Sequence, residues 1–245
     1  MSATTNKQQL LNTAYTSLKK KFGARETVVD PPRPVLEEVI YAICRENATP
    51  EEADAAYAAL RKTFLDWNEV RVSTVQELAD IFKPLDNTGL RARRIIGLLQ
   101  KVFEEEYAFS LEDLGKKGLK QAAKQLSRYK EEVDDFIVAW VVQRALGGHA
   151  VPLDDATLRV LGRLGLIQPN ETEDSESLES LRGTIEHLVP KARGPEITDL
   201  LSLHARTICV ADEPHCSQCP LKSDCPTGIE RLSKKPAEKK VKKSR

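Results

Sequence analysis

The sequence lacks the features that mark several large classes of protein. No apolar run in its 245 residues approaches the roughly 20 residues that a membrane-spanning helix needs. Glycine and proline number only 12 and 13, which argues against collagen-like and low-complexity chains. We find no secretory signal peptide, so we expect a protein that is not secreted, has no membrane partner and forms no disulfides.

An excess of charge of one sign is also absent, because 37 basic and 37 acidic side chains cancel. The balance hides an asymmetry. Residues 234–245 hold six lysines and one arginine against one glutamate, a net of +6, which leaves −6 for the other residues. A segment this charged cannot bury enough apolar surface to fold alone, so we expect a disordered basic tail over 233–245. Two interpretations stand for it, a solubilising terminus or an arm that attracts phosphate.

Strands are not indicated, because no segment alternates polar and apolar residues at period two. Apolar residues recur instead at helical spacing, and breakers such as the prolines of 30–34 separate the segments. The fold class predicted is therefore all-α, with residues 134–146 as a buried central helix. The predicted helices are 7–22, 35–45, 50–64, 74–82, 90–106, 110–117, 119–129, 134–146, 155–164, 178–188 and 195–207.

Cysteine is scarce, yet four of the five cysteines lie close together with the spacing C-x6-C-x2-C-x5-C. They are Cys209, Cys216, Cys219 and Cys225. Four thiolates are the ligand set of a [4Fe–4S] cluster or of an all-cysteine zinc site. Zinc sites usually use two short C-x2-4-C arms, and only one is present, so the spacing favours the iron–sulfur cluster, with zinc next. The fifth, Cys44, lies on the apolar face of a predicted helix and is expected to be an inert core thiol.

The run Leu203-His204-x-Arg206-x-x-Cys209, followed by these spacings, resembles the cluster loop of the endonuclease III family. These are iron–sulfur DNA glycosylases of the helix-hairpin-helix superfamily. The resemblance implies a two-domain helical fold, with a six-helix domain at 36–147 and a cluster domain built from 1–35 plus 148–232. It implies a monomer that binds double-stranded DNA in the cleft between the domains, in the cytoplasm (associated with the nucleoid) or in the nucleus.

The family's hairpin reads L-P-G-V-G-x-K-T-A, with an aspartate eighteen residues after the lysine. The lysine attacks the sugar C1′ and forms a Schiff base, and the aspartate assists departure of the base. The segment 153–160, L-D-D-A-T-L-R-V, resembles the family's V-D-T-H-x-x-R-V. The resemblance implies that Asp154 is the catalytic aspartate, or Asp155 if the register slips by one. Eighteen residues before Asp154 stands Phe136, which cannot form a Schiff base.

The hairpin glycines are also replaced, by Glu132 and Asp134. We expect these two acids and Asp135 to face a DNA phosphate, with a repulsion in water on the order of 1 kcal/mol per close pair. The cluster loop 210–215 is acidic where the family usually offers basic residues. Phosphate contacts are therefore expected elsewhere. The candidates are Arg91, Arg93 and Arg94 at a helix start, and Lys239 and Lys240 in the tail.

Two further residues have open interpretations. Asn47 falls where the family often has a glutamine that points into the lesion cleft, but a cap at a helix end is the interpretation that we favour. His204 could pack in the core or support the cysteines. For the whole chain we expect a monofunctional glycosylase in which Asp154 activates water without a lyase step. The alternatives are a catalytically inactive iron–sulfur protein that binds DNA, and a zinc-stabilised scaffold.

Overall fold

The computed structural model describes residues 3–25, 31–168 and 175–233, and no strand occurs within these ranges, which confirms the all-α class. The α-helices are α1 Ala3–Phe22, α2 Val35–Arg45, α3 Pro50–Thr63, α4 Trp67–Val72, α5 Val75–Ile81, α6 Thr88–Glu106, α7 Leu119–Leu126, α8 Asp135–Arg144, α9 Asp155–Arg163, α10 Ser175–Leu188, α11 Gly194–Thr207 and α12 Pro226–Ser233. Short 3-10 helices are η1 Glu112–Lys116, η3 Lys191–Arg193 and η4 Cys216–Gln218. The segment predicted as a helix over 110–117 is thus a single 3-10 element.

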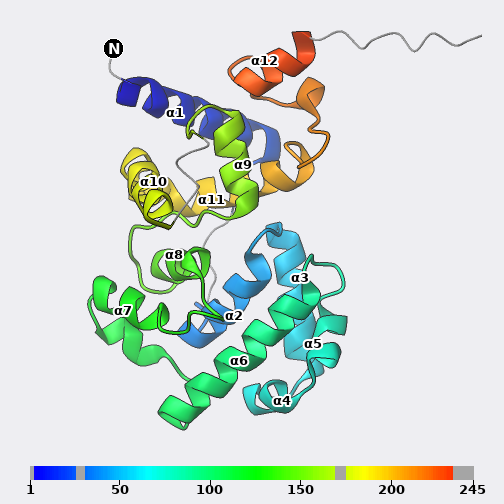
Figure 1. The fold of residues 1–245 in the computed structure, drawn as a ribbon, viewed down its shortest axis with the longest axis vertical. Helices are drawn as coiled ribbons and strands as arrows, with labels where there is room; N and C mark the ends of the chain where they lie inside the picture. Colours follow the sequence, from blue (N-terminus) through cyan, green and yellow to red (C-terminus); the bar gives the residue numbers. More distant parts are fainter. Residues whose placement is uncertain (1–2, 26–30, 169–174, 234–245) are drawn as a thin grey trace, which may run out of the picture.

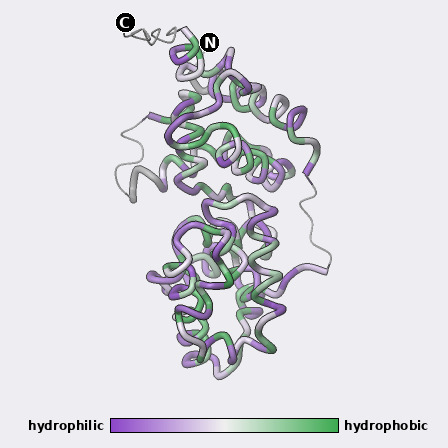
Figure 2. The backbone as a smooth tube through the Cα atoms, turned by 90° about the vertical axis from the view of Figure 1, so that its right-hand side faces the viewer, coloured by the Kyte–Doolittle hydropathy of each residue, from purple (hydrophilic) through white to green (hydrophobic). Residues whose placement is uncertain are grey.

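Two hydrophobic cores organise these helices. The first core is formed by the consecutive helices α2 through α8. The second core is formed by α1, α9, α10 and α11 together with the segment that carries the four cysteines. Figure 1 shows the first group in the lower part of the molecule and the second above it, and the turned view of Figure 2 shows the same two lobes. We therefore propose the division at 36–147 against 1–35 plus 148–232 as the domain boundary of the chain.

Helices α2 and α8 form the middle of the first core. Seven of the ten residues of α8 are buried, as the prediction of a central helix requires. Its Trp140 donates from Nε1 to the buried carboxylate of Glu38 on α2, at 2.6 Å, so the polar groups of this contact are satisfied inside the core. Cys44 on α2 is fully buried, and burial raises the pKa of its thiol to about 12, which agrees with an inert core thiol.

Buried charges tie the two cores together. Arg45 at the end of α2 is 1% exposed and donates to Ser202 Oγ at 2.7 Å and to Asp199 Oδ1 at 3.1 Å, both on α11. Arg144 on α8 donates to the other oxygen of Asp199, also at 3.1 Å. Such bonds fix the angle between the cores, because a buried charge that lost its partner would be costly. Among the described helices, none has both the length and the apolar character to cross a membrane.

Candidate functional site

A helix–turn–helix unit stands where the hairpin is expected. Residues 127–134 join α7 to α8, and the N–H of Val133 donates to the carbonyl of Tyr129 at 2.7 Å to close the turn. Asp134 caps α8 by accepting from the N–H of Ile137 at 3.0 Å. Phe136 follows in the first turn of α8, only 5% exposed, with its ring 5.9 Å from that of Trp140. The phenylalanine is thus part of the first core and forms one wall of a cavity.

Of the three hairpin acids, Glu132 does not point outward as expected, and Asp134 and Asp135 are paired with arginines. Glu132 is 4% exposed, and its carboxylate accepts from Lys101 Nζ on α6 at 2.8 Å. The charge of Asp134 is met by Arg94 at 2.8 Å, and that of Asp135 by Arg182 on α10 at 2.6 Å. The predicted repulsion of phosphate is therefore wrong for Glu132, which is buried, and overstated for the other two, whose charges are paired.

Asp154 is buried at the start of α9, with 4% exposure. One carboxylate oxygen accepts from the N–H of Thr157 at 2.8 Å, which is the N-cap bond of the helix. The other accepts from the N–H of Asn47, also at 2.8 Å, across the boundary between the two cores. Asp155, the fallback residue, is exposed at the next position. Two backbone donors, one on each oxygen, hold the Asp154 carboxylate in one orientation.

Asn47 acts as a cap, but for another helix than the one it follows. It lies directly after α2 in the left-handed region, at φ 52°, which asparagine tolerates better than most residues. Its side-chain oxygen accepts from the N–H of Ala156 in the first turn of α9, at 3.1 Å. Since its backbone N–H also donates to Asp154, Asn47 in the first core bonds both the first turn of α9 and the carboxylate that caps it.

An acidic cavity lies between the hairpin and the start of α9. It encloses about 560 Å³ of space between atoms, part of it open to solvent. Its polar lining is Glu46, Asp134, Asp135, Asp154, Asp155 and Arg182, and its apolar lining is Phe136, Leu153 and Leu158. Burial, and next the neighbouring Asp134 carboxylate, raise the pKa of Glu46 to about 7, against the opposing effect of Arg94. Sequence reasoning missed Glu46, because nothing in the motif marks it.

Of the predicted phosphate contacts, two are engaged inside the protein. Arg91 is 4% exposed and donates to three backbone carbonyls, those of Asp86, Ile43 and Glu46, so it closes the end of α2. Arg94 is 8% exposed and donates from Nε to the carbonyl of Glu132 in the hairpin, at 2.8 Å. We therefore correct the expectation that these two guanidinium groups reach DNA.

The other predicted phosphate contacts remain available or fall outside the structure. Arg93 is exposed on the surface of α6. Lys239 and Lys240 lie outside the described residues.

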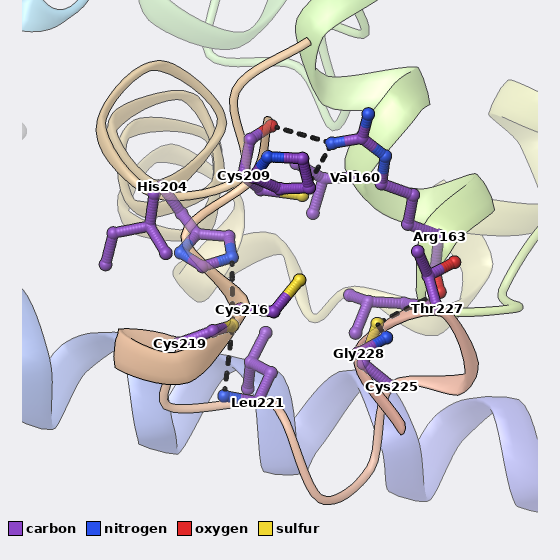
Figure 3. Close-up of a pocket in the computed structure, with 13 residues that line it drawn as sticks. Val160, Arg163, His204, Cys209, Cys216, Cys219, Leu221, Cys225, Thr227 and Gly228 are labelled. Carbon is purple, nitrogen blue, oxygen red and sulfur yellow. Dashed lines mark hydrogen bonds between the residues drawn. The ribbon is translucent and has the colours of Figure 1, made fainter. Parts of the chain in front are cut away.

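The four predicted cysteine ligands line one cavity, shown in Figure 3, of about 370 Å³ that is partly open to solvent. Cys209 follows α11, Cys216 begins η4, Cys219 follows η4, and Cys225 precedes α12. Backbone N–H groups approach two of the sulfurs: that of Leu221 lies 3.4 Å from Cys219 Sγ, and that of Gly228 lies 3.4 Å from Cys225 Sγ.

Two side chains support the cysteine cavity. Arg163 on α9 donates to the carbonyls of Cys209 and Val210, at 3.3 and 2.6 Å, and lies 3.5 Å from Cys209 Sγ. His204 is 1% exposed with Nε2 3.7 Å from Cys219 Sγ, and burial lowers its pKa to about 4, so the ring is neutral at pH 7. His204 therefore fits both interpretations at once, because it packs in the core and also contacts Cys219. Arg206 instead crosses to the first core and pairs with Asp86 at 2.9 Å.

The cysteines surround a space rather than a point. Among the described histidine, cysteine, aspartate and glutamate side chains, no three lie close enough to hold a single metal ion. The four sulfurs share one cavity, and within the described residues they form no ready-made site for a single ion.

Comparison with models of known protein families gives no match. In sequence, the chain is 29% identical over 79 residues to an endonuclease III homolog of Encephalitozoon cuniculi, a match that spans 32% of the chain and 31% of that protein. It is 25% identical over 173 residues to the DNA glycosylase/AP lyase ROS1 of Arabidopsis thaliana, which spans 66% of the chain and 12% of that protein. The matches thus cover less than a third of the length of these curated relatives.

Solved structures share the fold over almost the whole chain. A non-covalent endonuclease III–DNA complex superposes with a TM-score of 0.67 at 21% identity, covering 93% of this chain and 99% of that one. A thermostable thymine-DNA glycosylase gives 0.62 at 18% identity, covering 94% and 100%. The chain thus shares its fold with endonuclease III and a thymine-DNA glycosylase, and part of its sequence is similar to an endonuclease III homolog and to ROS1.

Proposed function

We propose that the chain is a monofunctional DNA glycosylase that hydrolyses the bond between a damaged base and its sugar. The observation that carries the proposal is the position of Asp154, which is buried, held by two backbone N–H groups, and part of the wall of the acidic cavity beside the hairpin. A base turned out of the duplex would enter this cavity. Asp154 would accept a proton from the attacking water and stabilise the cationic sugar.

A Schiff-base step has no candidate nucleophile in the cavity. Phe136 stands at the position where the family has its lysine, and no described residue that lines the cavity is a lysine. The nearby amine of Lys101 is bonded to Glu132 at 2.8 Å on the inner side of the hairpin. Hydrolysis by water is therefore the reaction that these residues support.

We further propose that Cys209, Cys216, Cys219 and Cys225 hold a [4Fe–4S] cluster. Their spacing in the sequence and their shared cavity support this ligand, as do the two N–H groups beside the sulfurs. When bound, the cluster would supply structural cross-linking of the loop between α11 and α12. Arg163 and the neutral His204 would hold the loop in place from α9 and α11.

Double-stranded DNA is the partner that this proposal requires, bound by a monomer in the nucleoid or the nucleus. The acidic cavity cannot attract phosphate, so binding would depend on basic residues outside it. Arg93 is the exposed candidate on α6, and Lys239 and Lys240 are the candidates in the tail. Such contacts would set affinity for all sequences alike, because phosphates carry no base information.

The test is a screen of lesion-bearing duplexes with the anaerobically purified wild-type protein. We expect base release that leaves an intact abasic strand, and no covalent complex after borohydride treatment of abasic DNA. Trapping of an internal lysine would contradict the monofunctional mechanism. Duplex binding without release of any base would favour the inactive alternative, to which the loss of the hairpin glycines and lysine points. Stoichiometric zinc without iron would contradict the cluster.

A further inference from the structure

We propose that Glu46 is the proton donor to the departing base, an inference that rests on the proposed glycosylase function and deepens it. Glu46 lines the acidic cavity together with Asp154, so one cavity offers two carboxyl groups to a bound nucleotide. Hydrolysis of a base–sugar bond can use two such groups. One delivers a proton to the leaving group, and the other receives a proton from water.

The position of Glu46 is fixed by bonds on both sides. Its own carbonyl accepts from Arg91 at 2.6 Å, and its carboxylate accepts from Arg94, also at 2.6 Å. The N–H of the next residue, Asn47, donates to Asp154. The chain therefore places Glu46 one residue away from the contact that orients Asp154, so the two carboxyl groups belong to one rigid unit.

The charges around Glu46 favour its protonated form. Arg94 is shared, since it bonds Glu46 at 2.6 Å and Asp134 at 2.8 Å, so one cation faces two carboxylates. The groups that face Glu46 are Arg91 and Arg94 from α6, Asp134 and Asp135 at the start of α8, Asp154 and Asp155 at the start of α9, and Arg182 from α10. Arg182 is engaged by Asp135 at 2.6 Å. With its side chain only 21% exposed, Glu46 keeps a proton that a solvated glutamate would lose.

Asp154 has different neighbours, because two backbone N–H groups donate to its two oxygens. Two carboxyl groups in one cavity with different surroundings are the arrangement that acid–base hydrolysis needs. In the step, the electron pair of the bond between base and C1′ moves to the base, which takes the proton of Glu46. Water then attacks C1′ and gives its proton to Asp154. Solvent then gives a proton to Glu46 and takes the proton from Asp154, so both carboxyl groups are back in their starting forms.

This assignment predicts a substrate class. A proton donor matters for a neutral base, which is a poor leaving group until it is protonated. A base that already carries a positive charge, such as 7-methylguanine, departs without a proton. Glu46 should therefore act on neutral lesions and be dispensable for cationic ones.

The test measures single-turnover base release from duplexes that contain uracil, 5-hydroxyuracil, 8-oxoguanine or 7-methylguanine. For neutral lesions we expect Glu46→Gln to slow release by about 10²- to 10⁴-fold. We also expect it to remove a decline of the wild-type rate as pH rises through the neutral range. Release of 7-methylguanine should change little. Glu46→Asp, which keeps a carboxyl group, should recover part of the rate and the pH dependence. Glu179→Gln, at an exposed position outside the cavity, is the matched control.

Several results would overturn the inference while leaving the glycosylase proposal standing. One is an equal rate of base release in wild type and Glu46→Gln. A second is a slower Glu46→Gln whose pH profile is unchanged, or which is slowed equally on 7-methylguanine. A third is a wild type that releases only 7-methylguanine. A wild type that releases no base at all would overturn the proposed function and this inference with it.

Discussion

Arg45 is the buried charge that should matter most for joining the two cores. We consider Arg45→Met, which keeps most of the side-chain volume and removes the donors. The change breaks the bond to Ser202 at 2.7 Å and the pair with Asp199 at 3.1 Å. It also removes the cation 5.4 Å from the ring of Trp140. Arg206→Met is the matched control, because Arg206 also crosses between the cores, from α11 to Asp86.

The expected losses differ because the surroundings differ. Removing one partner of a buried pair costs about 3–5 kcal/mol. Asp199 keeps its bond to Arg144 and Ser202 keeps its bond to the carbonyl of Ala48, so we expect the low end, about 3 kcal/mol. In the control, Asp86 is 63% exposed, and solvent screening limits the loss to below about 1 kcal/mol.

Urea and thermal unfolding of the holo-protein, followed by circular dichroism, would measure both losses. At roughly 2–4 °C per kcal/mol for a chain of this size, Arg45→Met should lower Tm by about 6–12 °C and the control by less than about 4 °C. Equal losses in the two variants would refute the claim that burial decides the difference. An Arg45→Met variant as stable as wild type would show that the desolvation of Arg45 offsets its bonds.

Three further predictions follow from other parts of the molecule. Burial and Asp134 raise the pKa of Glu46 from 4.5 to about 7, so the folded protein holds a proton that the unfolded chain releases in this range. The unfolding free energy of wild type should fall by up to about 3 kcal/mol as pH rises from 4.5 to 7, and that of Glu46→Gln should not show this fall. Cys219→Ser should lose the broad visible absorption of the cluster and most of its iron, and the second core should unfold at lower temperature; full iron content would contradict the ligand set. Deletion of residues 234–245 should flatten the dependence of log K for DNA on log salt by roughly 3–4 units if about four basic residues bind phosphate, and an unchanged slope would make the tail a solubilising terminus.

The sequence was sufficient for the long amphipathic helices and their caps. The bounds of α2 match the prediction. Helix α3 begins at the predicted residue 50, after a capping box in which Thr49 and Glu52 are bonded to each other's backbone N–H. Helices α4 and α12, at six and eight residues, escaped because they are too short to show a periodic pattern. Asp66 caps α4 through the N–H of Glu69 at 2.8 Å, a local signal that could have been used.

Residues of the site could be predicted only where they belong to a sequence motif. The cysteine spacing and the register from Phe136 to Asp154 place residues that do line two cavities. The direction of Glu132 was not predictable, because it depends on Lys101 of another helix. The burial of Arg91 and Arg94 was not predictable for the same reason, since arginines at a helix start are usually exposed. Glu46 gains its special environment from α6 and α8, which no local pattern reports.

The central step of the proposed reaction is the activation of water by the Asp154 carboxylate. Single-turnover base release by Asp154→Asn, compared with Asp155→Asn and with wild type on the best wild-type lesion, tests this claim. We expect Asp154→Asn to slow release by at least about 100-fold while iron content and helicity stay at wild-type values, and Asp155→Asn to remain active. Release by Asp154→Asn at the wild-type rate would contradict the mechanism, and loss in Asp155→Asn alone would move the role to that residue.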